Sequence, residues 1–471
     1  MRVGLVVAGL VICTILLAIV STATASNTAN PFEQFGELHT VKTADGVTIK
    51  ILHYCYKGVC NNGAQPIVLF SGLMANMNEY LAHTPAELKS RYAPSYSSIK
   101  IADWAKDDPN VTADPMLQHS IAYYLWKKGY DVWLVNYRGT GYDTFKSQVG
   151  SAYVSLDVWA IYDTPAAINY VYSKTGKNPI IGGHSTGGLV SYVYLQGTKF
   201  VSTPACLLGV PWCKKVVSDD RLVVERNGLT RGPQTVLGVI ALDPAMIPPL
   251  PEVIDTKIGW ILLDTPVYMD LRSVIELTAK NRMLWDTSLL TMNFLFTAIE
   301  EAYYSYGDRC ELIKALAMYA TEDMNDALGD FMVRFVADSL YTPTLVQYAD
   351  FGLRHTAREY FENGGRYYLI SPPEPKPGKD GYYYYIYNMK KVQVPFITIL
   401  SDLPGLVEAE QIEKDLMQAK TPHELDRTYR ISNTGHIDVP FGLKAPHEVF
   451  PKIGEWLDQM KSHYGYPTTP R

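Results

Sequence analysis

The chain has 471 residues, enough for one large α/β domain with an insertion or for two or three smaller domains. Hydrophobic residues make up 47% of it and charged residues 19%, which is a globular composition and excludes a largely disordered chain. The net charge of −6, with no long run of Lys and Arg, argues against nucleic acid as a partner.

The N-terminus carries the pattern of a secretory signal. Met1-Arg2 precedes an uncharged apolar run, 3–20, and Ala23 and Ala25 stand at the small-residue spacing of a signal-peptidase site. We expect 1–25 to be a cleaved signal peptide, although the run is also long enough to be a retained membrane anchor. Either alternative directs the chain into the secretory pathway, to secretion or to a lysosomal or vacuolar compartment.

The cysteines fit that compartment. Those outside the signal are Cys55, Cys60, Cys206, Cys213 and Cys310. The first two flank a turn and the next two flank Pro211, so each short spacing could close a disulfide in an oxidising lumen, leaving the last one odd. No spacing matches a metal site, and we expect no metal or other cofactor. Asn110 begins the only N-glycosylation sequon, which is typical of a surface loop.

The first half of the chain alternates apolar strands with helices. A β-hairpin is predicted within 38–54, around the turn Ala44-Asp45-Gly46. The polar, proline-containing stretch 84–117 is predicted to be a long surface loop. The other expected elements are strand 67–70, helix 120–128, strand 131–136, helix 156–174, strand 179–181, helix 189–195 and strand 236–242. This alternation predicts βαβ units and a mostly parallel, doubly wound sheet.

The pattern changes after residue 244. Residues 245–388 are mostly helical in periodicity and rich in Met, Leu, Tyr and Phe. The later expected elements are helices 288–304 and 312–319, strands 394–400 and 428–431, and a closing amphipathic helix, 447–460. The sequence thus predicts an α/β core made of 26–244 and 389–471. A helical cap, 245–388, is inserted in it over the carboxyl ends of the strands, where ligands bind.

The stretch Gly183-His184-Ser185-Thr186-Gly187 has the pattern of a nucleophile elbow. It follows an apolar run and precedes a helix, so the serine would project above the sheet from a turn too tight for side chains at the glycine positions. The five-residue pattern alone is common, and an ordinary glycine-rich turn between strand and helix is the alternative. The strand before it and the helix after it favour a nucleophile.

Ser185, Asp402 and His436 each lie just past the end of a predicted strand, in the chain order of the α/β hydrolases. An imidazole must take the proton of a serine hydroxyl, and a carboxylate must hold that imidazole in the right tautomer. We therefore predict these three residues as a catalytic triad. Asp243 also follows a strand and is the alternative acid, whereas Asp438 is expected to be structural.

An oxyanion hole needs two backbone N–H groups directed at the charge that develops on the substrate. One is expected from Thr186, directly after the nucleophile. The other is expected from the loop after Phe70, at Leu73. The preceding Ser71-Gly72 keeps a glycine that would let substrate approach closely.

Several longer strings in the chain are more specific than the elbow. They are 129–139, 162–168, Lys174-Thr175-Gly176, Gly183-His184-Ser185, Tyr385, Asn388-Met389, Val394-Pro395 and Gly435-His436-Ile437-Asp438. In these strings the chain resembles the acid lipase family, the gastric and lysosomal acid lipases of the α/β-hydrolase fold. The resemblance implies the triad and the oxyanion donors given above. It also implies a mobile lid in the cap, which would work at a lipid–water interface, and neutral-lipid esters such as triacylglycerol or steryl ester as substrates.

The chain departs from that family at several positions. Thr186 stands where the family usually has Gln, and Ser71 stands where it has His. The stretch 84–117 and the long cap are unusual, and Asp402 lies in Ser-Asp-Leu-Pro instead of a Gly-rich context. The hydrolysis of small esters or peptides therefore stays open, as does a non-catalytic lipid-binding protein, against which the intact Ser, Asp and His argue.

Overall fold

The structure is a computed structural model that describes residues 33–204, 207, 214–248, 267–306, 317–360, 374–403, 405 and 407–470. The predicted signal peptide, and with it the question of an anchor, lies outside the described residues, as do Cys206, Cys213 and Cys310. Of the two short cysteine spacings, the structure bridges Cys55 and Cys60 with a disulfide. Within the described ranges, no helix combines the length and the apolar character needed to cross a membrane.

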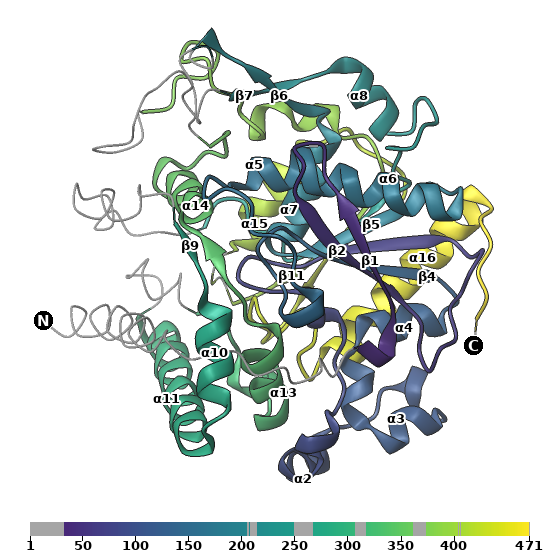
Figure 1. Ribbon diagram of the computed structural model, residues 1–471, viewed down its shortest axis with the longest axis vertical. Helices are drawn as coiled ribbons and strands as arrows, with labels where there is room; N and C mark the ends of the chain where they lie inside the picture. The colour runs from purple at the N-terminus through teal and green to yellow at the C-terminus, as the bar shows by residue number, and fades with distance from the viewer. Residues whose placement is uncertain are drawn as a thin grey trace, which may run out of the picture.

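An eight-stranded sheet forms the centre of the molecule (Figure 1). Its strands, in spatial order, are β1 (Gly36–Lys42), β2 (Thr48–Tyr54), β4 (Asp131–Asn136), β3 (Pro66–Phe70), β5 (Ile180–His184), β8 (Val239–Leu242), β11 (Phe396–Ser401) and β12 (Arg427–Ile431). The pairs β1–β2 and β2–β4 are antiparallel and all others are parallel. The predicted hairpin and the mostly parallel sheet of the α/β-hydrolase fold are thereby confirmed.

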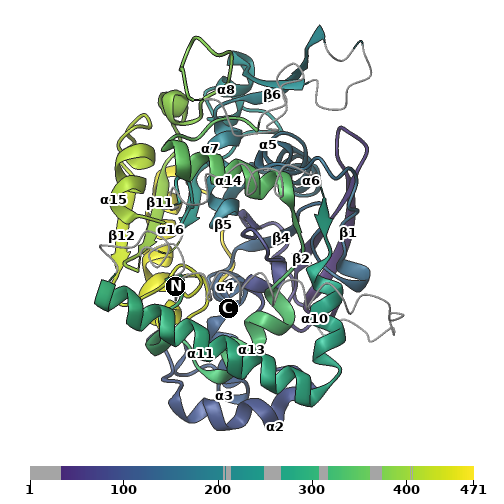
Figure 2. The ribbon, with the colours of Figure 1, turned by 90° about the vertical axis from the view of Figure 1, so that its left-hand side faces the viewer.

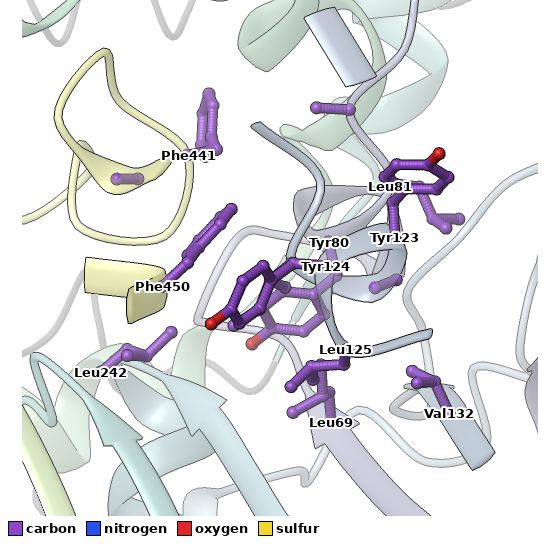
Figure 3. Packing of buried hydrophobic residues seen from close by; sticks show 14 of the residues in the cluster. Leu69, Tyr80, Leu81, Tyr123, Tyr124, Leu125, Val132, Leu242, Phe441 and Phe450 are labelled. Carbon is purple, nitrogen blue, oxygen red and sulfur yellow. The ribbon is translucent and has the colours of Figure 1, made fainter. Parts of the chain in front are cut away.

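The central strands are apolar along their whole length because both faces of the sheet are covered. Successive side chains point to opposite faces, so in β3 Ile67 and Leu69 join one hydrophobic cluster while Val68 and Phe70 join another. Figure 3 shows part of the first cluster, where Leu69 and Leu242 of the sheet lie below aromatic side chains that include Tyr124 and Phe450.

Helices supply the other half of each cluster. The first cluster includes side chains of α4 (Ile121–Lys127) and α16 (Phe450–Tyr464), and the second includes those of α6 (Thr164–Thr175) and α7 (Thr186–Leu195). The expected helix 156–174 is formed by α5 (Leu156–Val158), a π-helical segment (Trp159–Asp163) and α6. It ends at Gly176, whose φ of 68° is the left-handed conformation of a C-terminal cap.

The stretch 84–117 is not a loop, and that prediction was wrong. It folds into short helical segments, among them α2 (Lys89–Tyr92) and α3 (Pro109–Ala113), and it buries Tyr92 and Val111 in the first cluster. Asp108 begins one of these segments by accepting a hydrogen bond from the N–H group two residues later. Segments this short carry no helical periodicity, so the sequence pattern could not reveal them.

Cap helices lie between β8 and β11 in the chain. They are α10 (Leu271–Ala279), α11 (Arg282–Tyr306), α13 (Asp326–Phe331) and α14 (Thr342–Arg354). They lie toward the viewer in Figure 2, in front of the sheet. The predicted helix 288–304 is confirmed within α11, whereas 317–319, the described end of the predicted helix 312–319, is not helical. The cap boundaries at 245 and 388 stay a prediction.

One small unit was not expected from the sequence. After α7 the chain forms a two-stranded antiparallel ribbon, β6 (Thr198–Ser202) and β7 (Lys214–Ser218), which is followed by α8 (Asp220–Arg226). A second two-stranded pair, β9 (Tyr268–Met269) and β10 (Leu340–Tyr341), ties two parts of the cap together. Both ribbons lie outside the central sheet and leave its strand order unchanged.

Candidate active site

The backbone at Ser185 has the geometry of a nucleophile elbow. Its φ of 53° and ψ of −119° are strained for a residue with a side chain, and the elbow connects β5 to α7. A Cβ atom on Gly183 would lie 2.4 Å from the carbonyl oxygen of Phe70, and one on Gly187 would lie 2.0 Å from the same atom. The two glycines are therefore required by the close approach of β3.

His436 lies between Ser185 and an aspartate. Its Nε2 is 2.9 Å from Ser185 Oγ, and its Nδ1 is 2.7 Å from Oδ2 of Asp243. All three side chains are buried. An imidazole held in this way can take the serine proton and is oriented by the carboxylate at its other nitrogen. The structure thus brings together Ser185 and His436, as expected, with the alternative acid.

Asp402 does not contact His436, so its predicted place in the site is corrected. Its side chain is exposed and accepts a hydrogen bond of 3.1 Å from the N–H of Thr434. The strand β11 is buried along its whole length and ends at Ser401, so Asp402 lies in the bend beyond it, where its carboxylate meets the backbone of Thr434 instead of the ring of His436.

Asp243 follows β8, the neighbour of β5 in the sheet, and its carboxylate meets the ring of His436. Directly after β8 the backbone of Asp243 turns through a positive φ of 45°. Its carboxylate then accepts two hydrogen bonds from Ser401, from N–H to Oδ1 and from the hydroxyl to Oδ2, both 2.8 Å long. The residue before the predicted acid therefore supports the observed one.

Burial is the main cause that lowers the pKa of His436 below its ordinary value of 6.5. The hydrogen bond to Asp243 opposes this effect, and the nearby ring of His184 adds to it. A lowered pKa keeps the imidazole neutral, and hence able to accept a proton, into more acidic solution.

The two expected oxyanion donors flank the serine. A Cβ atom on Gly72 would lie 3.2 Å from Ser185 Cβ, so the loop after β3 that carries Leu73 runs directly beside the nucleophile. Thr186 is the first residue of α7, where backbone N–H groups have no acceptor within the helix. Its hydroxyl oxygen accepts a hydrogen bond of 2.8 Å from the hydroxyl of Tyr348 in α14, which links the cap to the elbow.

A second buried histidine was missed by the sequence analysis. His184, one residue before the nucleophile, has its Nδ1 2.5 Å from Oε1 of Glu79, and both side chains are buried. Nearby, the hydroxyl of Tyr80 accepts a hydrogen bond of 3.0 Å from the N–H of His184 and donates one of 2.7 Å to the carbonyl of Phe70. The sequence around Glu79, Met77-Asn78-Glu79-Tyr80-Leu81, offered no motif that would have identified it.

The loop that carries His436 is bound to the cap. Asp438 accepts hydrogen bonds from the N–H groups of Gly435, at 2.9 Å, and Ala320, at 2.7 Å, which agrees with its expected structural role. The N–H of Ile437 donates to the carbonyl of Met318 at 2.9 Å. Burial raises the pKa of Asp438 well above its ordinary range.

Groupings of potential metal ligands lie elsewhere in the described parts of the chain. They centre on His53 at the β1–β2 edge of the sheet, with Glu37 and His39 or with the two cysteines of the disulfide. Neither grouping includes a residue of the Ser185 site.

Comparison with known proteins agrees with the hydrolase-like geometry of the site. The chain is 33% identical to rat (Rattus norvegicus) gastric triacylglycerol lipase over 99 residues, 19% of this chain and 22% of the relative. It is 22% identical to Arabidopsis thaliana triacylglycerol lipase 1 over 426 residues, 88% of this chain and 84% of that one. The chain is thus similar in sequence to acid lipases, and its own sheet has the order of the α/β-hydrolase fold.

The other comparisons are shorter in sequence or lower in identity. Human lipase member K is 39% identical over 82 residues, so the matched segments of this lipase and of the rat lipase span only about a fifth of their own lengths. A solved monoglyceride lipase from Saccharomyces cerevisiae aligns with 95% of this chain and 100% of its own, at 12% identity and a TM-score of 0.47. No family model matches the chain.

Proposed function

We propose that the protein is a serine hydrolase that cleaves carboxylic esters of lipids. The observation that carries this proposal is the hydrogen-bonded series Ser185–His436–Asp243 at a strained elbow. Ser185 attacks the ester carbonyl while His436 takes its proton, and the N–H groups of Leu73 and Thr186 stabilise the oxyanion. His436 then returns the proton to the leaving alcohol and activates a water molecule that hydrolyses the acyl-enzyme.

Two observations support a lipid as the substrate class. Two of the relatives that match this chain are named as triacylglycerol lipases. The cap helix α11 also holds large apolar side chains in solvent: Met283, Leu290 and Phe294 are 73%, 72% and 76% exposed. These three residues recur at spacings of seven and four, along one side of the helix. Such a surface suits contact with a lipid–water interface.

Active-site labelling tests the proposal. The purified protein without residues 1–25 is treated with a fluorescent fluorophosphonate and assayed on a panel of p-nitrophenyl esters, emulsified triacylglycerol and steryl ester. We expect labelling of the native protein, none of the Ser185→Ala variant, and hydrolysis of long-chain esters. Labelling that survives in Ser185→Ala, or is absent from the native protein, contradicts the serine mechanism. Hydrolysis of short esters or peptides alone contradicts the substrate class.

A further inference from the structure

The pair formed by Glu79 and His184 lies directly behind the nucleophile and makes more contacts than a packing role requires. The two side chains are 3% and 5% exposed and meet at 2.5 Å. The ring nitrogen of His184 that faces away from Glu79, Nε2, lies 2.8 Å from the backbone carbonyl oxygen of His436. His184 thus joins the elbow to the loop that carries the general base of the proposed reaction.

Both ring nitrogens of His184 face an acceptor. A neutral imidazole carries only one N–H, so donating to a carboxylate and to a carbonyl together requires the imidazolium form. Burial by itself lowers the pKa of His184, but the charge and the hydrogen bond of Glu79 outweigh it and raise the pKa. Because both side chains are buried, the negative charge of the carboxylate and the positive charge of the imidazolium neutralise each other.

Glu79 also reaches a third loop. Its other carboxylate oxygen, Oε2, accepts a hydrogen bond of 3.2 Å from the N–H of Gly72. Gly72 immediately precedes Leu73, one of the two proposed oxyanion donors, and a Cβ atom there would lie 3.3 Å from Nδ1 of His184. One buried pair thereby touches the oxyanion loop, the elbow and the histidine loop.

We infer that Glu79 and His184 are positioning residues, which hold the oxyanion loop and the backbone of His436 in register with Ser185. This inference rests on the proposed function, since it assigns the pair to the same reaction. Neither side chain touches the reacting atoms. They act through the N–H of Gly72 and the carbonyl of His436. A displacement of either loop by a fraction of an ångström should lower kcat more than it changes substrate binding, because the transition state depends on exact geometry.

The test separates hydrogen-bond geometry from mere packing. In Glu79→Gln the amide can still accept from Gly72 N–H and donate to a neutral His184, which keeps its own bond to His436. In Glu79→Ala both links are lost. We expect Glu79→Ala to lower kcat by about 10- to 100-fold with KM within about threefold of the native value. Glu79→Gln should restore most of kcat, and His184→Ala should resemble Glu79→Ala.

A matched control exists at the other end of the sheet. His53 and Asp131 form a second buried histidine–carboxylate pair at the same 2.5 Å distance, away from the nucleophile. Asp131→Ala and Asp131→Asn should lower the thermal midpoint as the Glu79 variants do, with kcat unchanged.

Two results overturn the inference: an unchanged kcat in Glu79→Ala, or a loss in Glu79→Gln as large as in Glu79→Ala. If Glu79→Ala does not fold, Glu79→Gln is compared with the native protein instead. It should retain most of kcat, and a large loss of kcat then overturns the inference. Failure of the proposed function is recognised separately, because the native protein itself would then not be labelled by the fluorophosphonate.

Discussion

Ser401 donates two hydrogen bonds of 2.8 Å to Asp243, one to each carboxylate oxygen. The strand that was expected to supply the acid therefore supplies a support for it. A carboxylate that accepts hydrogen bonds from two donors has a restricted orientation. The two bonds from Ser401 therefore hold the Asp243 carboxylate where it can accept from Nδ1 of His436. Substitution of Asp243 and substitution of Asp402 should therefore have different effects on activity.

Asparagine substitutions compare the two aspartates directly. Asp243→Asn should lower kcat by about 10³- to 10⁴-fold, because the amide no longer stabilises the tautomer and the charge of His436. Asp402→Asn should leave kcat within about twofold, because its carboxylate is exposed and its hydrogen bond among the described residues is with the N–H of Thr434. Steady-state kinetics on one soluble ester measures both. A severe loss in Asp402→Asn with a mild one in Asp243→Asn would return the acid to Asp402.

The acid limb of the activity profile follows the pKa of His436. Because burial lowers this pKa from 6.5, the neutral, proton-accepting ring persists below pH 6.5, and activity should decline only in more acidic solution. The measurement is kcat/KM for a soluble ester as a function of pH. A midpoint of the acid limb above pH 6.5 would contradict the direction of the shift.

The exposed apolar side of α11 should matter for emulsions and not for soluble substrates. Leu290→Ser combined with Phe294→Ser should lower hydrolysis of emulsified triacylglycerol about tenfold or more, since burying each large apolar side chain contributes about 1.5–3 kcal/mol. Hydrolysis of a soluble ester should not change. Leu229→Ser is the control, as Leu229 is 60% exposed after α8, outside the cap. Equal losses on both substrates would show that the variant damages the site instead of interface binding.

A buried charge cluster near the end of β4 should dominate local stability. Arg138, 2% exposed, donates to Asp163 from Nε at 2.9 Å and Nη2 at 2.6 Å, and to Asp45 from Nη1 at 2.6 Å. Asp163→Ala leaves the guanidinium only partly compensated and should lower the free energy of unfolding by about 3–5 kcal/mol. Glu413→Ala, which breaks an exposed pair with Arg430, should cost about 0–1 kcal/mol. Urea denaturation measures both, and similar losses would refute the assignment.

The sequence was sufficient for the sheet, the elbow and the histidine, because each has a local pattern: apolar strands, flanking glycines, and a Gly-His pair after the last strand. It led to Asp402 as the acid, with Asp243 as the alternative, and that choice was wrong. Both follow strands, and the difference lies in side-chain contacts between distant segments, since Asp243 meets His436 whereas Asp402 meets the N–H of Thr434. Glu79 has no local pattern at all, since its partner is 105 residues away. The helical segments within 84–117 were not predicted because they are too short to show a helical periodicity.

The hydrogen bonds between the cap and the histidine loop limit how the cap can open. Met318 and Ala320 are bonded to Ile437 and Asp438, on the two positions that follow His436. If the whole cap swung away as one body, it would draw the imidazole off Ser185 and switch the enzyme off as substrate arrived. Any movement of the cap that keeps the imidazole beside Ser185 must therefore leave 317–320 in place.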